Sequence, residues 1–287
     1  MSVAQPTRRL AVLLPRAAAD GRASRAGSIL AQTWMLAAIA LALLASAVWA
    51  QAGAQAAAPA RPDALAVILR WAPLIFGGFL FNVLVSVLSM ALGTVLGLPL
   101  GLLLIAHGRL LRGAGWGVVQ FFRNVPWLVL LFYVMFLLPF QVHIGALALP
   151  VPAWFKAVIG LALPVAANVA EIVRGGMQSI PEPQWSAAEG LAFSRLQTVF
   201  RIILPQALRR MLPPWMNLYA ILTMATTLIS VIGIQDGLTL TRAAIAAESR
   251  PELTVPMYLF LLLLFFAYCY PIARLTLVLE RRVQVRT

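Results

Sequence analysis

The sequence predicts an all-α membrane protein, a polytopic bundle of about six transmembrane helices. Of its 287 residues, 62% are hydrophobic and only 11% are charged, whereas soluble domains carry about 25% charged residues. The mean hydropathy is +0.90, and long stretches without Asp, Glu, Lys or Arg recur along the chain. This composition excludes a conventional soluble enzyme. It also excludes a disordered chain, because disordered chains are poor in apolar residues.

The first predicted span covers residues 29–50 and follows an N-terminal segment, residues 1–28. A signal peptide is the alternative, because Arg8 and Arg9 precede the apolar run and a small-x-small site, Ala45–Ala47, lies within it. The run is longer than the roughly 7–15 residues of a signal-peptide core. We therefore interpret it as a retained helix. Both outcomes leave the remaining topology unchanged.

The second and third spans come from two further uncharged stretches. Residues 71–106 are too many for one straight span, so we interpret Trp71–Gly78 as interfacial and Phe79–Ala106 as the second helix. The third helix is expected over residues 124–140, where Pro139 ends it and a short polar link follows.

Three more spans complete the bundle. Pro152–Val173 is predicted as the fourth, with Lys156 extending its ammonium group to the lipid headgroups. Residues 211–235 and 253–273 are predicted as the fifth and sixth.

Six spans place both termini on one side of the bilayer, and the basic residues decide which side. Of the 22 basic residues, 17 fall on the side of the termini. The other five are Arg61, Arg70, Lys156, Arg242 and Arg250. Because cytoplasmic loops concentrate Lys and Arg, both termini are predicted to be cytoplasmic. The net charge of +13 therefore reflects orientation in a lipid bilayer, and we expect no nucleic-acid partner.

Glycines and polar side chains mark positions within the spans. Gly93, Gly97 and Gly101 form one helical stripe, which favours close helix packing, with a substrate groove as the alternative. Polar groups inside a membrane usually face the bundle interior or a cavity. The candidate substrate path consists of Asn82, Asn168, Asn217, Thr226, Thr227 and Ser230. For the asparagines, lining a path and joining helices are both open interpretations.

Charged residues also flank the fourth span. Glu171 and Arg174 have the i, i+3 spacing of a local ion pair. Arg123 is most simply an interfacial anchor.

Between the fourth and fifth spans lies a segment, residues 174–211, that is polar enough to leave the bilayer yet rich in helix-forming residues. It contains Trp185, Phe193 and Phe200, which a merely solvated loop does not require. We therefore predict short helices that offer a docking surface to a cytoplasmic partner, with a solvated loop as the alternative.

Chemistry-bearing motifs are missing from the sequence. A P-loop needs a Gly-Lys pair, but the only lysine, Lys156, follows Phe155. One cysteine and two isolated histidines do not make a zinc site. We expect no catalytic residues, no cofactor and no metal, so any fuel-splitting chemistry belongs to a partner.

Two strings carry a resemblance to a known family. They are AEIVRGGMQSIPEPQWSAAEGLAFSRLQTVFRIILPQALRRMLPPWMN, which begins at Ala170, and FFRNVPWLVLLFYVMFLLP, which begins at Phe121. Both resemble the permease subunits of bacterial ABC importers for polar amino acids, and TLISVIG and LERRV fit as well. The resemblance implies a permease domain over residues 75–280 with a coupling loop at 176–210, a tail at 281–287, and an additional first helix.

The family's loop has the pattern EAA, three residues, Gly, nine residues, I-x-LP. Five residues match it, namely Ala187, Ala188, Ile202, Leu204 and Pro205. Ser186 replaces the expected glutamate and Ala192 the expected glycine, while Glu189 and Gly190 lie nearby out of register. Further along, Met224-Ala225 replaces the frequent Lys-Asp.

The resemblance also implies partners and a place in the cell. The resemblance implies that the loop is a coupling helix, which sits in a groove of an ATP-binding cassette subunit. It also implies that a periplasmic solute-binding protein delivers an amino acid and that a second permease subunit, identical or homologous, completes the path through the bacterial inner membrane. FRNVP and Trp154-Phe155-Lys156 lean toward the glutamate/aspartate branch.

Three other functions compete with this interpretation. A secondary transporter would place ionisable groups at mid-membrane, and a membrane-embedded enzyme would need a catalytic constellation. The predicted spans carry only Lys156 and Glu171, near their ends, and Arg274 directly follows the sixth span. A structural membrane subunit is the third alternative.

Overall fold

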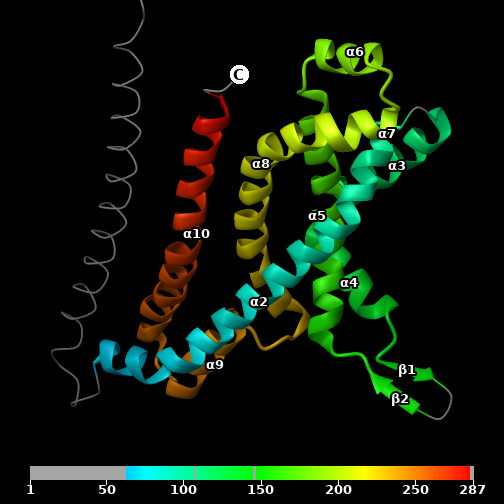
Figure 1. Cartoon of the computed structure of the whole chain (residues 1–287). Helices are drawn as coiled ribbons and strands as arrows, with labels where there is room; N and C mark the ends of the chain where they lie inside the picture. The colour runs from blue at the N-terminus through cyan, green and yellow to red at the C-terminus, as the bar shows by residue number, and fades with distance from the viewer. Residues whose placement is uncertain (1–62, 107, 145–146, 285–287) are drawn as a thin grey trace, which may run out of the picture. The chain divides into compact units, whose positions relative to one another are not determined.

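Helix α5, Ala153–Gln178, lies at the centre of the part of the chain that the structure describes. This computed structural model describes residues 63–106, 108–144 and 147–284, so the predicted segments 1–28 and 29–50 lie outside it. In α5, 72% of the most apolar window is buried, against 39% for α2, Ala64–Leu104, and 28% for α10, Thr254–Gln284. Figure 1 shows α2 crossing α5, whereas α10 stands apart from it. Helix α5 therefore forms the core against which α2 packs, and α10 packs mainly against other helices.

Helix α2, Ala64–Leu104, is longer than predicted. Its 41 residues form one continuous helix, so Trp71–Gly78 is not a separate interfacial segment. At about 1.5 Å per residue the helix exceeds the thickness of a bilayer core, and it crosses α5 obliquely (Figure 1). Once a helix has formed, each added residue gains one backbone hydrogen bond, so the helix can extend beyond the apolar segment that spans the membrane. Hydropathy alone therefore placed the start of α2 wrongly.

The glycine stripe is a packing surface between α2 and α5. A Cβ at Gly97 would lie 2.6 Å from the carbonyl oxygen of Ala166 and 2.6 Å from Cβ of Val169. Gly93 and Gly101 meet Val165 and Val173 in the same way. Since no side chain fits in this space, the stripe allows the two backbones to approach each other, and the packing interpretation is confirmed.

The predicted third span, residues 124–140, contains helix α4, Trp127–Leu137, and a helix that was not predicted, α3, Arg109–Asn124, precedes it. The two helices meet at an angle of 104°. Pro126 separates them, because it cannot continue the backbone ladder of α3. Helix α4 has 11 residues, about 16 Å, which is too short to cross a bilayer by itself.

A small hairpin follows α4. Strands β1, Gln141–Ile144, and β2, Leu147–Pro150, pair antiparallel, with Val142 opposite Leu149. The sequence interpretation expected only an irregular link there. The hairpin does not alter the all-α class, because helices make up the rest of the described architecture.

Lys156 does not reach the headgroups as predicted. Its side chain is 1% exposed, and Nζ donates hydrogen bonds to the carbonyl oxygens of Leu138, at 2.8 Å, and Met135, at 3.3 Å. Nζ also lies 3.6 Å from the ring centroid of Phe140. The last carbonyls of a helix have no intrahelical partners and carry partial negative charge. The lysine therefore stabilises the end of short helix α4.

Between α5 and α8 the chain forms three short helical pieces. They are α6, Glu182–Gly190, α7, Arg195–Gln197, and the π-helix η1, Thr198–Ile203. The prediction of short helices in this segment is confirmed. The π-helix ends next to Pro205, whose missing N–H interrupts the regular ladder.

The remaining elements complete the bundle. They are α8, Leu204–Ala225; the 3-10 helix η2, Thr226–Ile232; α9, Gly237–Glu248; the 3-10 helix η3, Pro251–Leu253; and α10, Thr254–Gln284. Helix α8 contains Pro213 and Pro214 and changes direction along its length (Figure 1). Helix α9 was not predicted, and α10 extends into the predicted tail.

The described residues contain four helices long and apolar enough to cross a membrane, or five spans if the bent pair α3–α4 counts as one. They are α2, α5, the continuous helical run Arg195–Ile232, and the run Pro251–Arg281. The predicted class, a helical membrane bundle, is confirmed. Helix α6 lies at one end of this bundle, and α9 and the hairpin lie at the other (Figure 1).

Candidate functional site

An open cavity of about 970 Å³ lies at the α6 end of the bundle. The second half of α5, the middle of α8 and the last third of α10 line it. Its wall is mixed in character, with polar groups such as Asn168, Glu171 and Asn217 beside apolar groups such as Ile221 and Leu277. Cavities of this size and polarity are typical of sites for small polar molecules.

Two predicted path residues, Asn168 and Asn217, line this cavity from opposite helices. Nδ2 of Asn168 donates a hydrogen bond of 2.8 Å to the carbonyl oxygen of Pro164. Pro164 lies one turn before Asn168 in α5, so the amide bonds back to its own helix. The bond employs one of the two amide N–H groups. Asn217 is exposed to the cavity.

Asn82 lies elsewhere, in a buried contact between α2 and the start of α9. Its Nδ2 donates to Oγ1 of Thr226 at 3.1 Å and to Oδ2 of Asp236 at 3.2 Å, and its Oδ1 accepts from the N–H of Gly237 at 2.9 Å. Asn82, Thr226 and Asp236 are all 0% exposed. We call Asn82, Thr226, Asp236 and Gly237 the α2–α9 junction.

Helix α9 begins at this junction for local reasons. Asp236 is its N-cap, and Oδ1 accepts a hydrogen bond of 2.8 Å from the N–H of Thr239. A Cβ at Gly78 would lie 2.8 Å from Cα of Gly237, so two glycines allow α2 and α9 to touch. The buried carboxylate is thus stabilised by an amide and a helix N-terminus.

The other predicted path residues satisfy themselves within their own turn. Oγ1 of Thr226 donates to the carbonyl of Thr223 at 2.7 Å, Oγ1 of Thr227 to that of Met224 at 2.9 Å, and Oγ of Ser230 to that of Thr227 at 2.8 Å. None of Thr226, Thr227 and Ser230 lines the cavity described above. The structure therefore brings only Asn168 and Asn217 together in one cavity.

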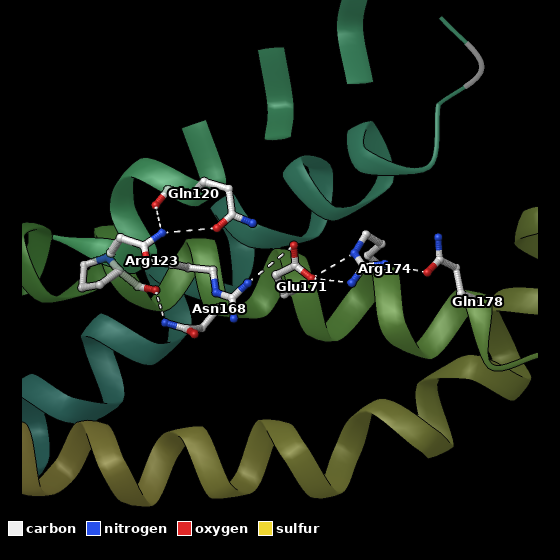
Figure 2. A network of polar contacts seen from close by, with 8 residues as sticks. Gln120, Arg123, Asn168, Glu171, Arg174 and Gln178 are labelled. Carbon is white, nitrogen blue, oxygen red and sulfur yellow. Dashed lines mark hydrogen bonds and ion pairs between the residues drawn. The ribbon is translucent and has the colours of Figure 1, made fainter. Parts of the chain in front are cut away.

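An arginine–glutamate network forms one side of the cavity, and we define it as Arg123, Glu171, Arg174 and Gln178 (Figure 2). Oε2 of Glu171 lies 2.8 Å from Nη2 and 2.9 Å from Nε of Arg174, and Oε1 lies 3.7 Å from Nη1 of Arg123. Arg174 also donates to Oε1 of Gln178 at 2.6 Å. The predicted pair between Glu171 and Arg174 is confirmed, and Arg123 additionally links the end of α3 to α5.

The predicted coupling residues on α6 divide by burial. Ser186, Ala187, Glu189 and Gly190 are exposed, whereas Ala188 is 2% exposed. Ala188 shares the inward face with Trp185, which packs against the main hydrophobic core and lies 5.7 Å from the Arg195 guanidinium carbon. The exposed face of α6 is therefore the surface that a partner can reach.

Ala192 ends this helix in a left-handed conformation, with φ of 56°. The N–H of Ala192 donates to the carbonyl of Glu189 at 2.9 Å, and the N–H of Phe193 to that of Ala188 at 3.1 Å. These two bonds define a Schellman motif, whose left-handed position favours glycine. The structure thus gives a physical reason for the glycine expected at this position. Ser194 and Gln197 then form a capping box that starts α7.

The remaining predicted coupling residues join the loop to the bundle. Ile202 and Leu204 are half-buried and pack against the main core, whereas Pro205 is exposed. Between them Ile203 is 0% exposed. Helix α8 continues from this segment without a break.

Sequence reasoning missed two features of these sites. Asp236 lies directly after the predicted fifth span, residues 211–235. An aspartate immediately before a helical segment is a recognisable N-cap signal. The pair of Arg123 and Glu171 joins residues far apart in the chain, and no local pattern indicates it.

Comparison with known proteins gives a consistent result. The family model described as "Binding-protein-dependent transport system inner membrane component" matches residues 93–285. The probable amino-acid ABC transporter permease protein YckA of Bacillus subtilis is 33% identical over 210 residues, which cover 73% of this chain and 89% of that protein.

Two further similarities concern substrate naming and fold. The glutamate/glutamine/aspartate/asparagine transport system permease protein BztC of Rhodobacter capsulatus is 31% identical over 73% of this chain, which spans only 48% of that protein. A solved structure titled as an amino acid ABC transporter with histidines has a TM-score of 0.66 at 23% identity and covers 78% of this chain and 100% of that chain. This last similarity concerns the fold alone.

Proposed function

The chain belongs to the family of inner membrane components of binding-protein-dependent transport systems, and on this premise we propose that it is the permease subunit of an ABC importer for polar amino acids. The observation that carries the proposal is the exposed face of α6, with Ser186 and Ala187, at the end of the bundle where the cavity opens. ATP hydrolysis belongs to a partner subunit, and a periplasmic binding protein delivers the solute.

The loop at residues 176–210 is the element that receives the mechanical input. Trp185 of helix α6 packs against the main core, Ala188 is 2% exposed, and η1 leads directly into α8. A push on the exposed face therefore moves α8, whose middle part forms one wall of the cavity. In a two-state transporter such a motion alternates access between the two sides of the membrane.

The orientation follows from the charge bias of the loops. The α6 end, both chain termini and the cavity mouth lie on the cytoplasmic side, and α9 and the hairpin lie on the periplasmic side. The cavity reaches from Asn217 to Ser179 and Arg210 at the α6 end. The described conformation is therefore open toward the cytoplasm, and the α2–α9 junction closes the opposite side.

The proposed substrates are polar amino acids, with the acidic ones as the finer proposal. A substrate α-carboxylate or side-chain carboxylate can accept hydrogen bonds from Asn168, Asn217 and the arginines at the cavity wall. The carboxylate of Glu171 offers a partner to an ammonium group. A second permease subunit, identical or homologous, provides the facing wall. BztC, whose name includes glutamate, glutamine, aspartate and asparagine, supports polar amino acids that include the acidic ones.

Neighbouring alanines on α6 provide a test of coupling. Cys269 is first replaced by serine, and cysteines are then placed at Ala187, which is exposed, or at Ala188, which is 2% exposed. We expect Ala187→Cys to cross-link to an ATPase subunit in membranes, and Ala188→Cys not to do so. Failure of Ala187→Cys to cross-link would refute the coupling role.

Uptake measurements test the transport function and its substrate. Ala187→Arg places a bulky cation on the proposed interface, and we expect ATP-driven uptake of labelled glutamate to fall at least about tenfold with unchanged amounts of protein in the membrane. Excess aspartate should compete with glutamate and excess leucine should not. Competition by arginine alone would keep the permease assignment and reject the acidic preference.

A further inference from the structure

A second cavity, of about 640 Å³, lies between α3 and the end of α5 and has a strongly basic lining. Four arginines contribute to it, Arg109, Arg112, Arg123 and Arg174, against one carboxylate, that of Glu171. Trp116, Gln120 and Gln178 add N–H donors. The volume falls within the roughly 300–1,000 Å³ of ligand sites. Four arginines against one carboxylate in a single cavity favour an anionic ligand.

Two of the arginines are available to such a ligand. Within the part of the chain that the structure describes, neither Arg109 nor Arg112 has an ion-pair partner, and both are exposed. They occupy one face of α3 at i, i+3 spacing, together with Trp116. Arg123 lies 3.7 Å from Glu171, longer than the roughly 2.7–2.9 Å of a charge-assisted hydrogen bond, so an anion can compete with Glu171 for it.

The opposite face of α3 is apolar and uncovered by the described residues. Leu110 is 87% exposed, Leu111 57% and Phe121 59%. A helix with one basic face and one exposed apolar face is typical of the membrane interface, where the apolar face enters the acyl region and the basic face meets the headgroups. The 104° bend before α4 turns α3 away from the direction of the following helix. A helix that lies along the membrane surface needs such a bend before a helix that enters the membrane.

We propose that the basic cavity between α3 and α5 binds the phosphate of an anionic phospholipid headgroup in the cytoplasmic leaflet. The inference rests on the proposed orientation, which places this end of the bundle at the leaflet that carries anionic lipids, where basic pockets between helices bind headgroups. A bound phosphate draws Arg123 away from Glu171, and both residues also line the larger cavity. The lipid therefore influences the polarity of the proposed substrate cavity.

Lipid binding to the purified full-length protein tests this proposal without measuring uptake. Native mass spectrometry compares dioleoylphosphatidylglycerol, which is anionic, with zwitterionic dioleoylphosphatidylcholine. We expect the double variant R109Q/R112Q to bind the anionic lipid roughly 25-fold more weakly, about fivefold for each arginine. R112K, which keeps the charge, should stay within about threefold of the wild type.

The matched control R201Q/R242Q removes the same charge from exposed arginines outside this cavity and should bind the anionic lipid as the wild type does. Equal binding of the two lipids by the wild type, or equal binding by R109Q/R112Q and the control, would overturn the proposal. Displacement of the lipid by millimolar inorganic phosphate would reassign the site to a free anion. If R109Q/R112Q aggregates on size exclusion, the single variants R109Q and R112Q decide the question. Uptake can persist in each of these cases, so the transport proposal is tested separately.

Discussion

Asn82 and Asn217 are identical side chains on apolar helices, yet the structure places them in opposite settings. Asn82 lies in the α2–α9 junction, is 0% exposed, and makes three hydrogen bonds to Thr226, Asp236 and Gly237. Asn217 is exposed and lines the open cavity at the α6 end. One region is dry and fully bonded, whereas the other presents polar groups to water.

This difference separates two uses of polar residues inside a membrane protein. A buried amide that bonds the polar groups of a neighbouring helix joins the two helices, because leaving any of these buried groups without a hydrogen bond costs free energy. A polar group facing a cavity costs little, since water solvates it, and it remains available to a solute. Measurements of stability and of uptake distinguish the two regions.

The largest effect is expected at the junction. Asn82→Ala leaves the Asp236 carboxylate and the Gly237 N–H without their amide partner in a buried space. We expect the free energy of unfolding to fall by about 3 kcal/mol, which lowers Tm by roughly 6–12 °C. Thermal unfolding in detergent measures the change. A shift below about 2 °C would mean that water replaces the amide and that the junction is not dry.

A smaller effect is expected where the cavity meets the arginine–glutamate network. Glu171→Gln removes the carboxylate shared by Arg123 and Arg174 while retaining the size of the side chain. The carboxylate is partly buried and the arginines are about one-third exposed, so we expect a loss of about 1–2 kcal/mol. The loss should diminish in high salt. A loss as large as that of Asn82→Ala would remove the distinction between the two regions.

At the α6 end, one substitution should stabilise the protein. Ala192→Gly relieves the left-handed backbone at φ of 56° in the Schellman motif. The gain is about 0.5–1 kcal/mol, because relief of the steric cost is offset in part by the greater freedom of glycine when unfolded. Thermal unfolding measures it, with Gly190→Ala in the same helix as a comparison. Destabilisation by Ala192→Gly would contradict the observed turn.

The smallest effect on stability is expected within the cavity. Asn217→Ala removes an exposed amide, and the free energy of unfolding should change by less than about 0.5 kcal/mol. ATP-driven uptake of glutamate should nevertheless fall, because the substrate loses a hydrogen-bonding partner. Leu208→Ala, an exposed position on α8 outside the cavity, serves as the control. Unchanged uptake by Asn217→Ala would remove this residue from the substrate path.

The sequence alone determined the membrane class, most of the apolar segments and the glycine stripe. These features depend on composition and local spacing, because a bilayer requires long apolar segments and small residues at helical spacing allow helices to pack closely. It also indicated the helices of residues 182–205, because turn residues and helix-forming runs are local signals. It misplaced the start of α2 and missed α9, since a hydropathy boundary does not coincide with the end of a backbone ladder.

Only the tertiary structure decided which polar residues meet. Asn82 and Asn217 have similar apolar neighbours along the chain, and nothing local distinguishes a junction from a cavity wall. The same holds for Lys156, which bonds the end of α4 instead of reaching the headgroups, and for Arg123, which meets Glu171 across two helices. The cost of burying a polar group depends on its partners, and those partners come from distant parts of the chain, so their identity is fixed only when the helices pack.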